Sequence, residues 1–155
     1  MSEENKAILR RVADEVFNQG NLDVVDELFA PNYVLHDPSI PGGERRGAES
    51  FKQQWVSMFR TAFPDLRLNV EDQAAEGDKV VTRYTVRGTH QGELMGIPPT
   101  DNEVVVGGMI VSRLSGGRIE EEWNNFDALG MMQQLGVVSE PGPGDEPPAS
   151  LKARH

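Results

Sequence analysis

The order of sequence patterns predicts an α+β fold, in which helices come first and strands follow. Apolar residues recur at helical spacing in residues 5–19, and this spacing gives a helix one buried face. From residue 66 onward, segments rich in Val, Thr and Tyr alternate with short turn sequences, as hairpin-linked strands do. We therefore predict helices packed on one face of a curved, mainly antiparallel sheet.

Three helices are predicted before the strands. Gly20 ends the first helix, and Asn21 can cap a second, short helix that stops at Pro31. The third helix carries an aromatic stripe that includes Trp55 and Phe59.

A short strand at residues 33–36 and a turn-rich segment at residues 40–47 separate the second helix from the third. The remaining predicted elements are strands at residues 66–74, 79–90, 103–114 and 118–125 and a last helix at residues 127–134. We expect one domain at residues 1–137 and a disordered Pro/Gly-rich acidic tail at residues 138–155.

Composition excludes several classes of function. The chain has no cysteine, so a thiolate nucleophile, a Cys-based metal site and disulfides are absent, as suits a cytoplasmic protein. A net charge of -10 disfavours nucleic acid and anionic membrane surfaces. No apolar run approaches the ~20 residues of a membrane span. We expect a small ligand that is not a polyanion.

Residues 88–101 form a turn that could line the rim of a pocket. His90 lies where a strand becomes this loop, and Pro98 and Pro99 cannot continue a central strand. Histidine exchanges a proton easily near neutral pH, so His90 is a candidate catalytic residue. A hydrogen-bonded structural histidine explains the same position equally well.

Alternation sorts the side chains of the last predicted strand onto two faces. Ile119, Glu121, Trp123 and Asn125 share one face, and Glu120, Glu122 and Asn124 share the other. Crowded carboxylates in a closed pocket would gain proton affinity, and a raised pKa would suit Glu122 for general acid/base catalysis. In the alternative interpretation, these glutamates lie on a solvated outer face of the sheet. On the neighbouring strand, Gly108 and Ile110 fit a cavity floor or close backbone packing, and Arg113 is expected to pair with a carboxylate such as Glu121.

Two further acidic positions have both a functional and a structural interpretation. His36 and Asp37 are adjacent at a strand end, but neighbours on a strand point to opposite faces, so a dyad requires a bend at Pro38. Asp127 begins the last helix and can simply cap it.

Several spaced motifs resemble the SnoaL-like polyketide cyclase (ester cyclase) family of the nuclear transport factor 2-like superfamily, over about residues 16–136. They are Ala62-Phe63-Pro64-Asp65, Gly88-Thr89-His90-Gln91-Gly92, Gly96-Ile97-Pro98-Pro99-Thr100, Gly117-Arg118-Ile119 and Gln134-Leu135-Gly136. The resemblance implies a cone-shaped, cystatin-like α+β barrel around a hydrophobic pocket. It also implies aldol-type ring closure of a polyketide ester without metal or cofactor.

The resemblance transfers only part of the family's site. It places the acid/base aspartate of characterised cyclases at Asn124, which cannot exchange a proton at neutral pH. It places their pocket histidine at Ile110. His90 and Asp127 are retained, and Glu122 shares the face of Asn124 and could take over the proton transfer.

Three hypotheses follow. The first is an enzyme that moves a proton on a small hydrophobic carbonyl compound, with Glu122 or Asp127 as base and His90 or His36 polarising an oxygen. The expected pocket residues are Asn124, Ile110, Gly108, Trp55, Phe59, Tyr33 and Met95. The second is a non-catalytic pocket that binds a small molecule. The third is a homodimerisation module that pairs through an exposed sheet face bearing Met109, Val111 and Trp123.

Overall fold

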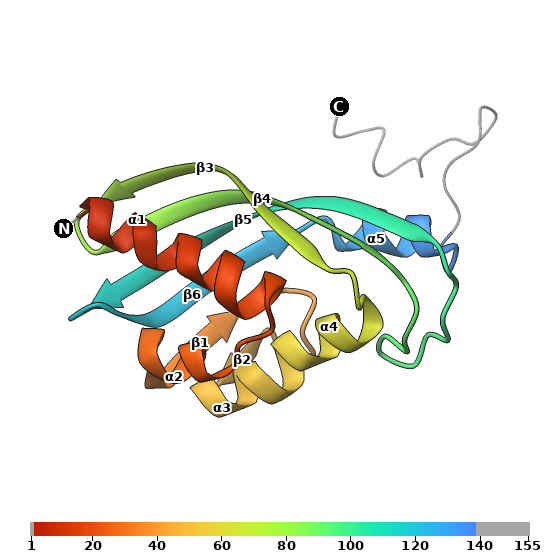
Figure 1. Ribbon diagram of the computed structural model, residues 1–155, viewed down its shortest axis with the longest axis horizontal. Helices are drawn as coiled ribbons and strands as arrows, with labels where there is room; N and C mark the ends of the chain where they lie inside the picture. Colours follow the sequence, from red (N-terminus) through yellow and green to blue (C-terminus); the bar gives the residue numbers. More distant parts are fainter. Residues whose placement is uncertain (1, 139–155) are drawn as a thin grey trace, which may run out of the picture.

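The computed structural model describes residues 2–138, which form a six-stranded sheet with helices against its concave face (Figure 1). The predicted tail lies outside the described residues apart from residue 138. The elements are α1 (Ser2–Arg11), η1 (Val12–Asn18), α2 (Asp23–Leu28), β1 (Phe29–His36), β2 (Glu44–Arg46), α3 (Ala48–Ser50), η2 (Phe51–Val56), α4 (Ser57–Ala62), β3 (Arg67–Glu76), β4 (Lys79–Thr89), β5 (Glu103–Ser115), β6 (Arg118–Phe126) and α5 (Ala128–Leu135).

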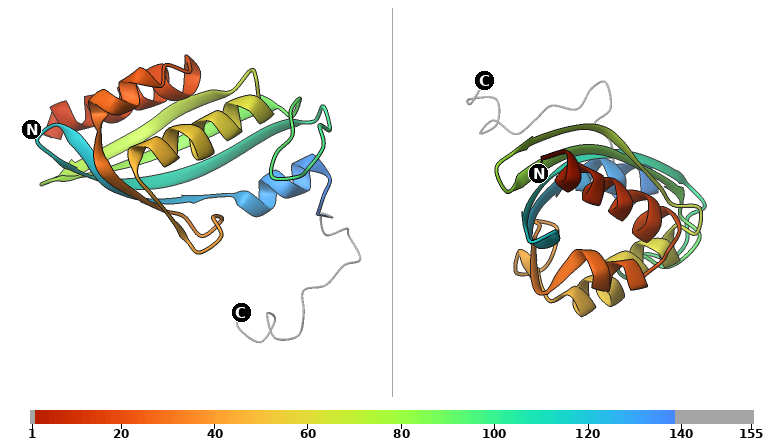
Figure 2. Two further views of the ribbon diagram at one scale, coloured as in Figure 1. Left: turned by 90° about the horizontal axis from the view of Figure 1, so that it is seen from below. Right: turned by 60° about the vertical axis from the view of Figure 1, so that its left-hand side comes forward.

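The predicted α+β class is confirmed, and the sheet is mixed. Its strand order is β2-β1-β6-β5-β4-β3, in which β3 to β6 form an antiparallel meander. β1 pairs parallel to β6, and β2 pairs antiparallel to β1. Figure 2 shows the strongly curved sheet wrapping around the helices. This is the cone that the resemblance implied.

The first and third predicted helices each contain a stretch of π-helix that the spacing of apolar residues did not reveal. In the first, η1 continues α1, and Gln19 N donates to Asp14 O five residues earlier. In the third, η2 lies between α3 and α4. Both stretches turn buried side chains toward the sheet. Short π-helical segments are rare and occur often beside functional sites.

Two predictions near the chain start need correction. The strand predicted at residues 33–36 begins at Phe29 and includes Pro31, which lies where the pairing of β1 with β6 is irregular between Phe29 and Val34. A proline is tolerated there because it interrupts no regular ladder. The segment predicted as turn also contains β2, which pairs Glu44 with His36.

A β-bulge changes the faces predicted for β6. The register with β5 shifts between Arg113, which pairs with Glu121, and Leu114, which pairs with Ile119, so Glu120 is the extra residue. Ile119 is therefore fully buried on the inner side with Glu122, where strict alternation placed the two on opposite faces. Arg113 binds Glu120 at 2.7 Å and Glu121 at 3.2 Å on the outer side, as the sequence predicted for Glu121.

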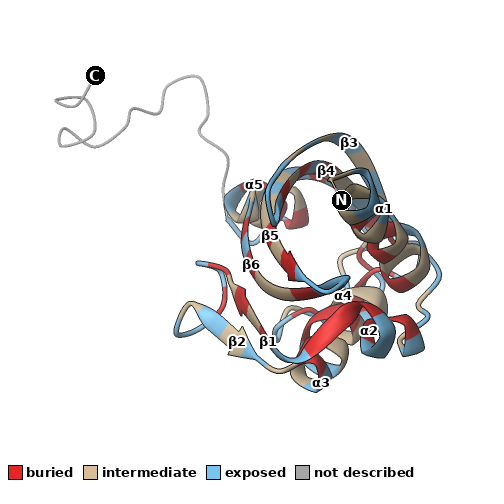
Figure 3. Cartoon of the chain, turned by 90° about the vertical axis from the view of Figure 1, so that its left-hand side faces the viewer, coloured by how far each residue is buried: buried red, intermediate tan, exposed pale blue. Residues whose placement is uncertain are grey.

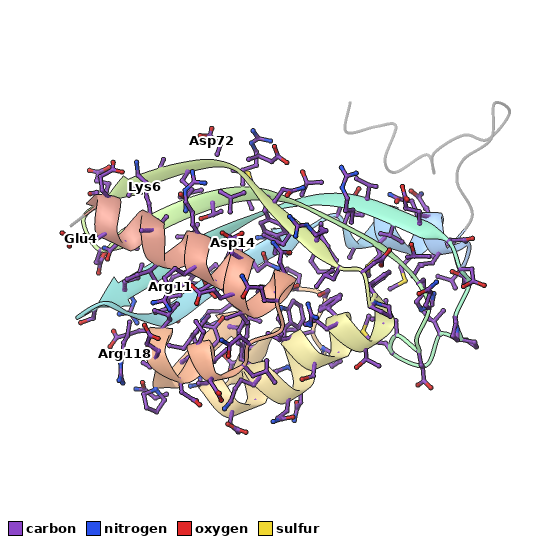
Figure 4. The ribbon with its side chains drawn as sticks, in the orientation of Figure 1. Glu4, Lys6, Arg11, Asp14, Asp72 and Arg118 are labelled. Carbon is purple, nitrogen blue, oxygen red and sulfur yellow. The ribbon has the colours of Figure 1, made fainter. Side chains whose placement is uncertain are left out.

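The core lies between the helices and the inner face of the sheet, where buried side chains concentrate (Figure 3). Tyr33, Phe29 and Phe51 pack edge-on or tilted, with ring centroids 4.8 to 5.2 Å apart. Arg11 joins α1 to α2 through a 2.6 Å hydrogen bond to Glu27, and Figure 4 labels Arg11 between these two helices. No helix within residues 2–138 is long and apolar enough to cross a membrane.

Asp127 caps α5, since its Oδ1 accepts the Gly130 N–H at 2.8 Å. We expect Asp127→Ala to lower the free energy of unfolding by about 1 kcal/mol, because a helix N–H loses its acceptor. Asp127→Asn should stay close to the wild type, since asparagine caps as well. Urea denaturation measures both, and equal losses in the two variants would contradict the capping role.

Candidate active site

An apolar cavity of about 110 Å³ lies between the helices and the sheet. Its walls come from the helices α1, η1, η2, α4 and α5 and from the strands β1 and β3 to β6. Four polar side chains line it: Thr82, Tyr84, Glu122 and Asn124. Among the described residues that line the cavity, no Lys, Arg or His is present.

Strand register brings the polar side chains together from residues that are far apart in sequence. Thr82 pairs with Ile110, and Ile110 pairs with Asn124, which makes one row across β4, β5 and β6. The next row ends in Ser112 and Glu122. Because side chains two residues apart on a strand share a face, both rows lie on the inner side of the sheet.

Glu122 is a buried carboxyl held by two hydroxyl groups. It is 3% exposed. Tyr33 donates to Oε1 at 2.7 Å, and Ser112 donates to Oε2 at 2.5 Å. Burial disfavours the charged form and raises the pKa of Glu122 to about 7, although the two hydrogen bonds oppose this shift. A carboxyl with this pKa exchanges a proton at neutral pH.

A second buried chain of hydrogen bonds runs beside Glu122. Asn124 donates from Nδ2 to Asp37 Oδ2 at 2.8 Å. Its Oδ1 accepts from the Tyr84 hydroxyl at 2.6 Å. Ser39 completes the chain by donating its backbone N–H and its hydroxyl to Asp37 Oδ1. Burial raises the pKa of Tyr84, so this phenol stays protonated at neutral pH.

Gly108 lets Tyr84 reach Asn124. A Cβ at Gly108 would lie 2.5 Å from the Tyr84 hydroxyl oxygen and ring Cζ, so the ring crosses β5 only because this position has no side chain. Of the two interpretations of Gly108, close packing is the one that the structure supports. Gly108 itself is not among the residues that line the cavity.

His36 and Asp37 point to opposite sides of the sheet, so they form no dyad. His36 Nε2 lies 2.6 Å from Glu121 Oε2, and the ring stacks on Trp123 with centroids 5.5 Å apart. The hydrogen bond from His36 lowers the pKa of Glu121. His36 lies outside the cavity because β1 keeps its alternation up to Asp37, which turns inward.

His90 is fully buried and does not line the cavity. Its Nδ1 accepts the Thr100 N–H at 3.2 Å, so the rim loop folds back onto the ring, and the ring lies against Phe63. Its Nε2 has no hydrogen-bond partner among the described residues. The position matches a structural histidine that fixes the loop.

The other predicted residues divide into two groups. Trp55, Phe59, Ile110 and Asn124 line the cavity together with Glu122. Tyr33 does not line the cavity but lies behind Glu122, to which its hydroxyl donates. Asp127 only caps α5. Met95 is 51% exposed in a turn and is not a lining residue. Within residues 2–138, no three His, Asp or Glu side chains gather as metal ligands.

The sequence prediction missed Tyr84, Thr82, Ser112 and Asp37 as members of the polar cluster. Alternation along β4 carries a signal for two of them, since Thr82 and Tyr84 fall on the same face as the apolar Val80. Alternation along β1 likewise places Asp37 on the same face as Leu35. The reach of Tyr84 across Gly108 depends on contacts between distant strands, which no local pattern reports.

Glu122 should make stability depend on pH. Its folded pKa of about 7 lies above the ordinary value of 4.5, so its favourable contribution is complete below about pH 4.5 and is lost as the pH rises through about 7. We expect the wild type to lose about 3 kcal/mol relative to Glu122→Gln over this range. Urea denaturation at several pH values measures the difference, and a constant difference would refute the buried, shifted carboxyl.

Gly108→Ala should move the Tyr84 ring and break its bond to Asn124. We expect a loss of roughly 1–3 kcal/mol in the free energy of unfolding, as for other overpacked sites. Gly107→Ala is the matched control, because a Cβ there meets only the Tyr84 backbone oxygen at 3.7 Å. Similar stabilities for the two variants would show that Tyr84 does not need the space above Gly108.

Comparison with known proteins gives a consistent picture. The model of the SnoaL-like polyketide cyclase family matches residues 7–135. The chain is 33% identical over 131 residues to nogalonic acid methyl ester cyclase from Streptomyces nogalater, an alignment that covers 84% of this chain and 94% of the relative.

Solved structures agree with the sequence matches. A candidate SnoaL-like polyketide cyclase from Jannaschia sp. CCS1 superposes with a TM-score of 0.79 at 25% identity, covering 88% of this chain and 94% of that one. Wild-type IdmH from Streptomyces antibioticus superposes with a TM-score of 0.74 at 36% identity, covering 86% and 99% of the two chains. The chain therefore belongs to the SnoaL-like polyketide cyclase family.

Proposed function

We propose that the protein is an ester cyclase that closes a ring in a small, hydrophobic, polyketide-like carbonyl compound without a cofactor. The observation that carries the proposal is Glu122, a buried carboxyl with a pKa of about 7 in the wall of an apolar cavity. Membership of the cyclase family and the similarity to nogalonic acid methyl ester cyclase support a carbonyl substrate of this class.

Glu122 is proposed as the general base. Its carboxylate removes a proton from the carbon beside a substrate carbonyl, and the electron pair of that C–H bond forms an enolate. The enolate carbon then attacks a ketone carbon of the same molecule, and the resulting alkoxide takes up the proton. Tyr33 and Ser112 hold the carboxylate in place, and its remaining lone pairs are available for the proton.

Thr82 and Asn124 are proposed to bind the substrate oxygen, in place of His90 and His36. Thr82 accepts from Gln73 Nε2 at 3.3 Å, which leaves its own proton for a substrate oxygen. Asn124 uses one of its two amide protons on Asp37. Hydrogen bonds that strengthen as charge develops on an enolate oxygen lower the barrier to proton removal.

The proposal is tested with nogalonic acid methyl ester as substrate. We expect Glu122→Gln to lower kcat by about 10²-fold or more, because a positioned general base contributes about that much. For the wild type, kcat/KM should rise with pH through about 7, since the base acts in its ionised form.

Glu121→Gln is the matched control, because it makes the same chemical change on the outer side of the same strand. It should keep its turnover. Undiminished turnover in Glu122→Gln would refute the assignment of the base. Tight binding of the ester with no conversion would instead favour the non-catalytic pocket, in which Asn124 serves only as a hydrogen-bond anchor.

We also propose that two copies pair through the outer sheet face, as the sequence suggested. Met109 is 52% exposed and Trp123 is 36% exposed there, and both adjoin Val111, which pairs with Trp123 across β5 and β6. A contiguous apolar group of this kind is typical of an interaction surface. Light scattering of the purified chain distinguishes a dimer from a monomer.

A further inference from the structure

The hydrogen bonds around Asn124 can run in only one direction. Asp37 Oδ1 accepts the Ser39 backbone N–H at 2.8 Å and the Ser39 hydroxyl at 2.7 Å, and its Oδ2 lies 2.8 Å from Asn124 Nδ2. A carboxylate accepts but does not donate. The amide of Asn124 must therefore turn its NH₂ group toward Asp37, since the opposite orientation would place two acceptor oxygens face to face.

This orientation determines what Tyr84 can offer to a ligand. With its NH₂ group on Asp37, Asn124 presents Oδ1 to the Tyr84 hydroxyl, 2.6 Å away. A phenol has one proton, and that proton is committed to Asn124. Tyr84 lines the cavity, so the oxygen lone pairs that remain are its polar contribution to a bound molecule.

We propose that Asp37 is a positioning residue that acts through Asn124 to make the Tyr84 hydroxyl a hydrogen-bond acceptor toward the cavity. The site then favours neutral ligands that present an N–H or O–H donor at Tyr84. The inference rests on the proposed function only in taking the cavity as the place where the substrate binds.

An isosteric substitution of Asp37 should reverse the direction of the hydrogen bonds from Asp37 to Tyr84 without removing any of them. In Asp37→Asn, the new amide oxygen accepts from Ser39, so the new NH₂ group faces Asn124. Asn124 must then rotate by half a turn and donate to the Tyr84 oxygen. The Tyr84 proton is displaced toward the cavity, and the hydroxyl becomes a donor.

The experiment measures binding of two bicyclic probes of similar size by calorimetric titration. Indole carries a donor N–H, and 1-indanone carries an acceptor carbonyl. All titrations are made at one pH above the Glu122 pKa of about 7, so that this carboxyl is ionised throughout. The readout is the ratio of the two dissociation constants in each variant, since Thr82 offers its proton to a carbonyl whichever way the Tyr84 hydroxyl points.

Four variants distinguish the effect of Asp37 through Tyr84 from other effects on the ratio of the two affinities. Asp37→Asn should shift the indole to 1-indanone ratio by about 10-fold or more toward 1-indanone. Tyr84→Phe should lower the indole preference, and Asp37→Asn should no longer shift the ratio when it is combined with Tyr84→Phe. Glu121→Gln, the same carboxylate-to-amide change on the outer side of the sheet, should keep the wild-type ratio.

The proposal is overturned if Asp37→Asn keeps the wild-type ratio, or if the shift persists without the Tyr84 hydroxyl. Should Asp37→Asn fail to fold, Tyr84→Phe alone decides, because an unchanged indole preference in that variant also overturns the proposal. Binding is measured without turnover, so a failure here leaves the Glu122 assignment standing. The loss of the Glu122 assignment likewise leaves the probe ratio unaffected.

Discussion

Two carboxyl groups buried inside one small domain impose the main constraint on this structure. Glu122 and Asp37 are 3% and 2% exposed, and removing a charged carboxylate from water costs several kcal/mol unless donors replace the lost hydration. Tyr33 and Ser112 supply these donors to Glu122, and Ser39 and Asn124 supply them to Asp37. Most polar side chains near the cavity therefore serve as hydrogen-bond donors to one of these two carboxyl groups.

The sheet can meet this requirement because its register is unusual at two places. The bulge at Glu120 turns Glu120 and Glu121 outward to Arg113 while Ile119 and Glu122 both stay inside. The parallel pairing of β1 with β6 brings the end of β1, and with it Asp37, alongside Asn124. On the opposite wall, the two π-helical stretches bring apolar side chains over the same polar group of residues.

Local sequence patterns predicted much of the fold, because helical and strand periods are properties of neighbouring residues. They also placed Glu122 with Asn124, since both follow the bulge and alternation holds from there on. They failed for Ile119, because a bulge leaves no mark in a strand's composition. They failed for His36 and His90, because histidine chemistry suggested a site whereas tertiary contacts use both rings on Glu121 and Thr100.

The absence of lysine, arginine and histidine among the described lining residues has a consequence for ligand charge. A ligand with a free carboxylate would shed its hydration shell in this cavity without meeting a counter-ion, and it would lie close to the negative charge of Glu122. The methyl ester of the same acid would incur neither penalty. The cavity would therefore select neutral ligands over anionic ones.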